Sequence, residues 1–190
     1  ADVFAMRVSY AGELGWERHM PSWQLISIYE SLFEMGSPFG IRDFGGQAFN
    51  SMRLEKMYRA YGAEFTEEIS ALEAGMDRFL DLSRNFIGSD YIKERQSKGV
   101  ETQLAYLIFD DEIPAECFGN EAVFDGNELS GIITSGAYGY RVGHSVAFAY
   151  LNPSHCSEGK SLRVETSLGS RNCHVSMNAA YDNDNEKLRS

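Results

Sequence analysis

The hydrophobic pattern changes its period near residue 100, and this change limits the possible folds more than any other feature of the sequence. Beyond that point, short apolar segments alternate with Gly, Asn, Asp or Pro and show no helical spacing. These segments cover residues 103–110, 122–124, 129–134, 145–151, 161–165 and 174–176. Asp125-Gly126 separates two of them and is typical of a hairpin turn, because both residue types tolerate positive φ. The second half is therefore expected to form a small antiparallel barrel or sandwich.

The first half mixes strand and helix patterns. Residues 3–10 alternate in polarity, and their apolar set forms the half-buried face of a predicted strand. This set consists of Phe4, Met6, Val8 and Tyr10. Apolar residues at helical spacing predict helices over residues 23–35 and 44–56. Ser22 and Asp43 precede these helices and are residue types suited to cap their N-termini.

The boundary between the two halves follows from a third predicted helix. This helix covers residues 90–98 and ends at Gly99, which closes the first structural unit. Residues 71–82 fit either a short helix or a strand. The chain is therefore divided into an α+β unit, residues 1–100, and a β unit, residues 101–190.

The chain is acidic, with 17 Lys and Arg against 28 Asp and Glu and a net charge of −11. This excess argues against a nucleic acid partner, because binding to a phosphate backbone needs a basic surface. The sequence has no apolar run of ~20 residues that could span a membrane. Its first residues do not resemble a signal peptide. These features predict no membrane partner and a cytoplasmic location.

The three cysteines, Cys117, Cys156 and Cys173, lack CxxC spacing and suit free thiols in a reducing cytoplasm. A metal site is the alternative, because His155 and His174 each adjoin a cysteine. Neighbouring residues of a strand point to opposite faces, so each Cys–His pair is poorly placed to share one ion. We therefore predict packed thiols and no metal ligands.

The turn from Tyr10 to Glu17 is the candidate binding site. Its eight positions contain two glycines, two aromatic residues and two carboxylates. A carboxylate offers two parallel acceptors, which suit a flat heterocycle with two adjacent N–H donors, such as a pterin or a guanine edge. An aromatic ring can stack on the same heterocycle. The alternative is a solvent-exposed turn with ordinary surface acids, and the residues alone favour it.

Two further clusters are interpreted as structural. Residues 50–56 are expected to form a solvated helix face with the apolar Met52 and Leu54 buried. Glu55 and Arg59 can pair at i,i+4 if that helix continues. Residues 134–143 contain three glycines but lack a following helix and the Lys-Ser/Thr pair of a phosphate-binding loop. We interpret them as tight turns of the barrel.

Several blocks of the sequence resemble a single family, in order along the chain. The first is RVSYAGELGWE (residues 7–17), which resembles the segment that opens the second half of the glycine-cleavage T-protein (aminomethyltransferase) family. The next comprises NSMRLEKMYRAYGAEFT (50–66) and ALEAGMDRF (71–79), and it is most similar to the folate modules of dimethylglycine and sarcosine dehydrogenases. Residues 119–153, from GNEAVFDG to AYLNP, resemble the family's C-terminal barrel.

The resemblance implies an α+β fold in which a ferredoxin-like α/β half-module precedes a small antiparallel β-barrel. It implies tetrahydrofolate as the cofactor and a small amine as the one-carbon donor, either a methylated amine or a glycine-type compound. In the family, a Glu at the position of Glu17 binds the pterin. Tyr10 matches a Tyr of the same motif and is expected to contact the ring or the tail. Glu13 matches a frequent acid, to which we assign no role.

The resemblance also implies that part of the family's enzyme is absent from this sequence. The family's first half holds an Asp thought to assist the folate nitrogen, so no catalytic residue is assigned here. FAD would belong to a separate upstream domain of the dehydrogenase members. These residues alone are therefore expected to be inactive, to bind folate weakly and to self-associate through the surface left by the missing half. Phe49 stands where glycine-cleavage enzymes usually carry an Arg that helps to hold the folate.

Three other functions remain open at this point. One is a folate-dependent demethylase on the same scaffold. A second is a non-catalytic regulatory or binding module that retains the fold. The third is a plain structural domain, which would not bind folate at all.

Overall fold

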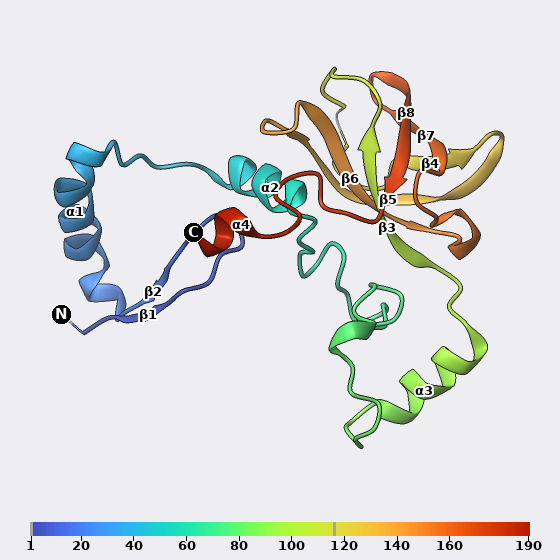
Figure 1. Ribbon diagram of the computed structural model, residues 1–190, viewed down its shortest axis with the longest axis horizontal. Coiled ribbons are helices and arrows are strands. Elements are labelled where there is room, and N and C mark those ends of the chain that lie inside the picture. Colours follow the sequence, from blue (N-terminus) through green and yellow to red (C-terminus); the bar gives the residue numbers. More distant parts are fainter. Residues whose placement is uncertain (1, 116) are drawn as a thin grey trace.

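The structure has a barrel at one end and an open helix-and-hairpin arm at the other (Figure 1). The computed structural model describes residues 2–115 and 117–190 of the 190-residue chain. Between the two ends, α2 lies against the barrel, and the C-terminus returns to the middle of the molecule beside the β1–β2 hairpin. Residues far apart in sequence therefore meet around α2.

Six antiparallel strands close the barrel in the order β3-β6-β5-β4-β7-β8, with β8 pairing back to β3. Their bounds are β3 Gln103–Phe109, β4 Ala122–Asp125, β5 Glu128–Gly139, β6 His144–Leu151, β7 Ser161–Thr166 and β8 Gly169–Ser176. The closed barrel confirms the prediction of a small antiparallel barrel or sandwich and shows that it is a barrel. Closure removes the exposed edges that an open sheet would have. The Asp125-Gly126 turn joins β4 to β5, and Gly126 has a φ of 59°.

Strand β5 is longer than the predicted segment of residues 129–134. It continues through Gly136 to Gly139, so part of the glycine-rich region interpreted as turns is strand. A side chain at Gly136 would place its Cβ 2.7 Å from the Cβ of Cys117. Glycine is therefore required here by the close approach of another segment, which is the usual meaning of a glycine inside a strand.

Strand β3 of the barrel is buried on both faces. Along β3, Leu107 and Phe109 belong to the cluster inside the barrel, whereas Leu104 and Tyr106 belong to a second cluster that includes Leu54 of α2. This alternation follows from the two-residue period of a strand. The second cluster explains why α2 (Gly46–Glu55) packs on the barrel wall, where it contacts β5 and β6.

The remaining elements lie outside the six barrel strands. They are β1 Phe4–Met6, β2 Glu17–His19, α1 Leu25–Gly36, α3 Ser89–Lys98 and α4 Glu186–Arg189, with short 3₁₀ turns at Ser22–Gln24, Ser37–Phe39, Asp77–Phe79 and Pro153–His155. Strands β1 and β2 form a two-stranded antiparallel sheet. The predicted α+β class with a small antiparallel barrel is confirmed.

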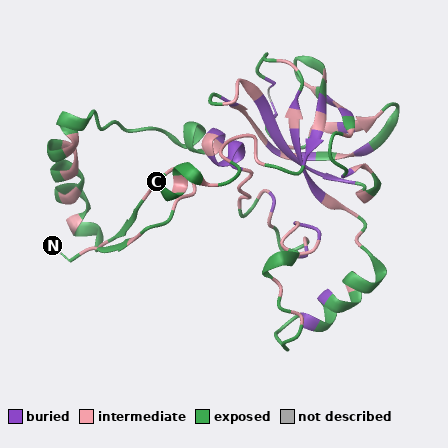
Figure 2. Cartoon of the chain, viewed as in Figure 1, coloured by how far each residue is buried: buried purple, intermediate pink, exposed green. Residues whose placement is uncertain are grey.

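The arm contributes little to the buried core, as the burial colours show (Figure 2). Every residue of α1 is exposed or half-buried, although its apolar stripe is present, and Ile26 and Met35 are 71% and 75% exposed. The expected half-buried face of the first strand is only partly formed, because Met6 and Tyr10 are half-buried but Phe4 and Val8 are exposed. A two-stranded sheet needs another layer to cover it, and the described residues place none on this face.

Several local predictions need correction. Helix α1 begins at Leu25 after a 3₁₀ turn, with Gln24 rather than Ser22 as its N-cap. The N-cap of α2 is Gly45, while Asp43 accepts a hydrogen bond from Tyr29 Oη at 2.7 Å. In both cases the helix begins two or more residues after the position that the predicted cap residue indicates. Residues 71–82 form turns and one 3₁₀ turn instead of a regular helix or strand.

A buried ion pair fastens α2 to the barrel. Arg53 and Glu64 have side chains that are 3% and 0% exposed, and Arg53 Nη1 lies 3.0 Å from Glu64 Oε2. Glu64 also accepts hydrogen bonds from the hydroxyls of Thr134 and Ser135 on β5 and from the backbone N–H of Ala60. The expected solvated face of residues 50–56 is therefore wrong, because their charges are paired inside the fold.

We predict that Glu64→Gln destabilises the fold by about 3–5 kcal/mol, because it leaves the buried Arg53 cation unpaired. Chemical denaturation followed by far-UV circular dichroism measures the loss. Glu67→Gln is the matched control, since Glu67 is exposed in the same segment. Equal stability of the two variants would show that the Arg53–Glu64 pair does not hold the fold together.

Candidate functional site

The loop between β1 and β2 carries the residues singled out in the sequence, and Tyr10 anchors it beside α2. Tyr10 Oη donates a hydrogen bond to the carbonyl of Arg59 at 2.7 Å. Its ring centroid lies 5.3 Å from that of Phe49 and 6.1 Å from that of Tyr58, the latter stacked. Burial raises the pKa of Tyr10, so the phenol stays protonated and acts as a donor.

The rings around Tyr10 form an aromatic surface, which we define by Tyr10, Phe44, Phe49 and Tyr58. The Phe44 ring centroid lies 6.3 Å from that of Phe49. Phe44 is 60% exposed and Phe49 is 36% exposed, so part of the surface faces solvent. Aromatic rings pack against one another in tilted or offset-stacked arrangements, and an exposed ring can accept one more planar partner.

Glu17 lies at the start of β2, where it pairs in register with Met6. Its side chain is 54% exposed, and its carboxylate lies 3.5 Å from Nε2 of His19. A ligand in solvent can therefore reach this carboxylate. Tyr10 and Glu17 share one loop but have different surroundings, because Tyr10 packs on aromatic rings and Glu17 projects from the hairpin.

Glu13 has partners within the protein. It accepts hydrogen bonds from Tyr181 Oη at 3.0 Å and from Arg141 Nη2 at 3.3 Å. The guanidinium of Arg141 also lies over the Tyr181 ring, 5.2 Å from its centroid. Glu13 thus ties the candidate loop to the barrel turn and to the C-terminal segment, a role that the sequence pattern did not assign.

The expected Glu55–Arg59 pair does not form, because α2 ends at Glu55. The Glu55 carboxylate instead accepts hydrogen bonds from the backbone N–H groups of Arg141 and Val142, at 2.7 and 3.2 Å. Burial raises the pKa of Glu55, and these two hydrogen bonds partly offset the shift. Arg59 Nε donates to the carbonyl of Ala74 at 2.8 Å. Glu55 therefore holds the β5–β6 turn, which lies next to Glu13.

Sequence reasoning missed the ion pair between Lys56 and Asp182. Their side chains are 1% and 7% exposed, and Lys56 Nζ lies 3.0 Å from Asp182 Oδ2. The two residues are 126 positions apart. Local periodicity carries no information about a contact over that separation.

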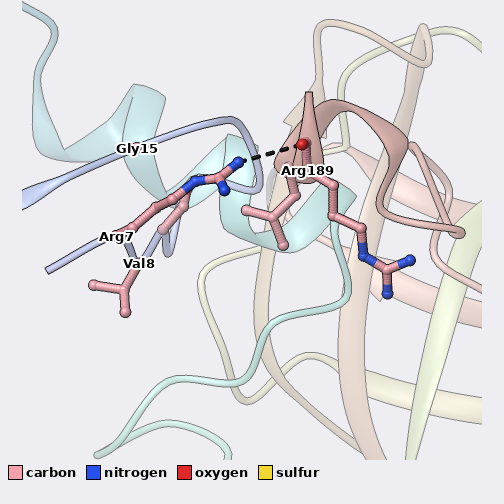
Figure 3. A pocket seen from close by; sticks show the side chains of 6 residues that line it. Arg7, Val8, Gly15 and Arg189 are labelled. Carbon is pink, nitrogen blue, oxygen red and sulfur yellow. Dashed lines mark hydrogen bonds between the residues drawn. The ribbon is translucent and has the colours of Figure 1, made fainter.

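A small cavity of about 400 Å³ lies between the candidate loop and the C-terminal helix (Figure 3). The lining residues are Arg7, Val8, Ser9, Gly15, Leu188 and Arg189. Arg7 Nη2 donates a hydrogen bond to the carbonyl of Arg189 at 3.2 Å. The Arg189 guanidinium points away from that of Arg7, so the two cations do not converge on one ligand.

The cysteines are packed thiols, as predicted. All three are unpaired and buried. Burial raises the pKa of Cys156 to about 11 and is the largest cause of the rise at Cys117 to about 12, so both thiols are protonated at neutral pH. Among residues 2–115 and 117–190, no group of three or more His, Cys, Asp or Glu is arranged to hold a metal ion.

Within the described part of the chain, none of the helices combines the length and apolar character needed to cross a membrane.

Two family models match the chain. Residues 1–84 match the GCVT N-terminal domain, and residues 103–182 match the glycine cleavage T-protein C-terminal barrel domain. A solved structure, the glycine cleavage system aminomethyltransferase T from Bartonella henselae, superposes with a TM-score of 0.86 at 22% identity. That superposition covers 96% of this chain and 50% of the other. At this identity the likeness concerns the fold.

The curated relatives are considerably longer proteins. Human mitochondrial dimethylglycine dehydrogenase is 36% identical over 166 residues, which are 86% of this chain and 19% of the dehydrogenase. Human mitochondrial sarcosine dehydrogenase is 29% identical over 79% of this chain and 16% of its own length. The aminomethyltransferase of Thermoanaerobacter pseudethanolicus is 28% identical over 86% of this chain and 44% of its own length.

Asp182 makes stability depend on pH. Burial on its own raises the pKa of Asp182, but hydrogen bonds from Lys56 and from backbone N–H groups lower it overall. The folded-state pKa therefore lies below the unfolded value of about 3.9. The carboxylate stabilises the fold fully above the unfolded pKa, and this contribution is lost as pH falls through the folded-state pKa.

We therefore expect the melting temperatures of wild type and Asp182→Asn to differ most near neutral pH and to converge in acid. Thermal melting over a series of pH values measures the difference. A gap that stays constant into strong acid would mean that the Asp182 charge does not stabilise the fold.

Proposed function

Because this chain belongs to the glycine-cleavage T-protein (aminomethyltransferase) family, we propose that it supplies folate-binding residues of a one-carbon transferase. The ligand is tetrahydrofolate, and the one-carbon unit comes from a methylated amine or a glycine-type donor. The observation that supports this most is the loop from Tyr10 to Glu17, which carries the accessible carboxylate of Glu17 and, through Tyr10, joins the partly exposed aromatic surface beside α2. We place the division between the two domains near residue 100.

Glu17 is proposed to bind the pterin edge. Its carboxylate is accessible and can accept two adjacent N–H donors at once. Tyr10 is proposed to contact the ring or the tail of the folate from the neighbouring aromatic surface. Phe49 belongs to that surface and replaces the Arg of the glycine-cleavage enzymes, so contact with the folate at this point is apolar rather than ionic.

The chemistry proposed for the bound folate depends on positioning. A transferase that holds the folate nitrogen against an electrophilic carbon gains rate from effective molarity. We assign no acid–base residue to this chain, and we propose that these 190 residues alone turn over no one-carbon donor. FAD, where a dehydrogenase relative uses it, would be bound outside the matched residues.

The buried thiols support a reducing compartment such as the cytoplasm.

Substitution of Glu17 tests the proposal. Glu17→Gln removes a charged hydrogen-bonding partner, and we expect it to weaken tetrahydrofolate binding by about 1.5–3 kcal/mol, or roughly tenfold to a hundredfold in Kd. Isothermal titration calorimetry under anaerobic conditions measures the affinity. Glu128→Gln, an exposed strand position on the barrel, is the control and should bind as wild type does. Unchanged affinity in Glu17→Gln would remove Glu17 from the site.

The uncovered arm predicts self-association. Apolar side chains of α1 and of the turn before it are exposed, among them Trp23, Ile26 and Met35. Exposed apolar patches of this kind are typical of interaction surfaces. We expect light scattering to show a mass that rises with protein concentration, and Ile26→Lys to lower it. A strictly monomeric chain at every concentration would contradict this expectation.

A further inference from the structure

The last fourteen residues cross the molecule and end beside the candidate loop (Figure 1). We call this segment, residues 177–190, the C-terminal clasp. The backbone N–H of Tyr181 donates to the carbonyl of Glu55 at 3.0 Å, and its phenol donates to Glu13 at 3.0 Å. At the far end, the carbonyl of Arg189 accepts a hydrogen bond from Arg7. The clasp therefore contacts both α2 and the β1–β2 loop.

The buried Lys56–Asp182 ion pair joins the clasp to the end of α2. Lys56 Nζ donates to the Asp182 carbonyl at 2.5 Å as well as to its carboxylate. The same carboxylate accepts the backbone N–H of Glu186 and so begins α4. Asp182 has a φ of 45°, in the left-handed region that only a few non-glycine residues adopt. The surrounding contacts must therefore hold this bend in place.

The stem of Lys56 also supports the candidate loop. Gly12 is buried and has a φ of 78°, and a Cβ built on it would lie 1.9 Å from Lys56 Cγ. The loop backbone therefore rests directly on the Lys56 side chain, with no room for a methyl group. The position of the loop therefore depends on the conformation of the Lys56 side chain. Asp182 fixes that conformation by binding the ammonium group.

We propose that the Lys56–Asp182 ion pair is a positioning device for the loop from Tyr10 to Glu17. This inference rests on the proposed folate site. Without Asp182, the buried ammonium would have to leave its enclosed position for water, because an unpaired buried charge is costly. The stem under Gly12 would move with it. The loop would then lose its support, and a ligand would have to order it on binding.

Lys56 affects ligand binding only by supporting the loop and does not bind the ligand itself. Its side chain is 1% exposed, so a folate in solvent cannot touch its ammonium group. Asp182 is equally enclosed by Lys56 and by the first turn of α4. Both are therefore positioning residues, and their effect must be measured on the loop itself as well as on affinity.

Trp16 provides a direct probe of the loop. The chain has two tryptophans, and the other one, Trp23, is 78% exposed outside the loop. In a Trp23→Phe background, acrylamide quenching and fluorescence anisotropy report on Trp16 alone. We expect Lys56→Met and Asp182→Asn each to raise the quenching constant by about twofold or more and to weaken tetrahydrofolate binding by about fivefold or more.

Two matched controls separate positioning from general destabilisation. Lys98→Met breaks an exposed ion pair with Glu94 and should leave Trp16 unchanged. Gly12→Ala and Gly40→Ala impose similar strain at positive φ, but only Gly12→Ala drives a methyl group into another side chain. Of these two glycine variants, we expect Gly12→Ala to mobilise Trp16 and Gly40→Ala to leave it unchanged. This pair keeps the proposal testable even if the charge variants fail to fold.

The outcomes distinguish this inference from the proposed function. Mobilised Trp16 together with weaker folate binding supports both. If Trp16 is mobilised in the variants but the chain without these substitutions binds no tetrahydrofolate, the positioning of the loop is supported and the folate site is overturned. The third outcome is that the chain without these substitutions binds tetrahydrofolate, while Lys56→Met, Asp182→Asn and Gly12→Ala leave both Trp16 quenching and affinity unchanged. This result would overturn the positioning role and leave the folate site standing.

Discussion

The buried Arg53–Glu64 ion pair is the interaction on which the rest of the structure depends, because it joins the first hundred residues to the barrel. Arg53 belongs to α2, Glu64 to the segment that follows, and Ser135 of β5 completes the network on the barrel side. With α2 fixed on the barrel wall, Glu55 at the end of that helix faces the barrel turn, and the following residue, Lys56, faces the C-terminal clasp. The interactions of the charged residues Arg53, Glu55 and Lys56 therefore set the position of the candidate loop.

Such an arrangement has an energetic consequence. Buried charges are costly to place in a protein interior, and they are tolerated only when each has a partner of good geometry. Arg53, Glu55 and Lys56 also have partners that are distant in sequence, namely Ser135, Arg141 and Asp182. These contacts specify how the barrel, the hairpin loop and the C-terminus meet. The arm that carries α1 has no comparable attachment among the described residues, and its apolar stripe stays open to solvent.

Much of the barrel could be predicted from the sequence because strand periodicity and turn residues are local properties. The length of β5 could not, because Gly136 looks like a turn residue until the approach of Cys117 is known. The burial of Glu64 and Asp182 was hidden for a similar reason, since their partners lie far away in the chain. The family resemblance identified Tyr10 and Glu17 as candidates, but the role of Glu13 emerged only from its contacts with Arg141 and Tyr181.

The most direct test of the central claim is a residue-resolved NMR titration of the isotope-labelled chain with tetrahydrofolate. If the loop is the folate site, the amide signals of Tyr10 to Glu17 and of Phe49 shift in a saturable way, and the signals of β7 and β8 stay in place. Saturable shifts confined to the barrel strands, or no shifts at millimolar folate, would contradict the assignment of the loop as the binding site.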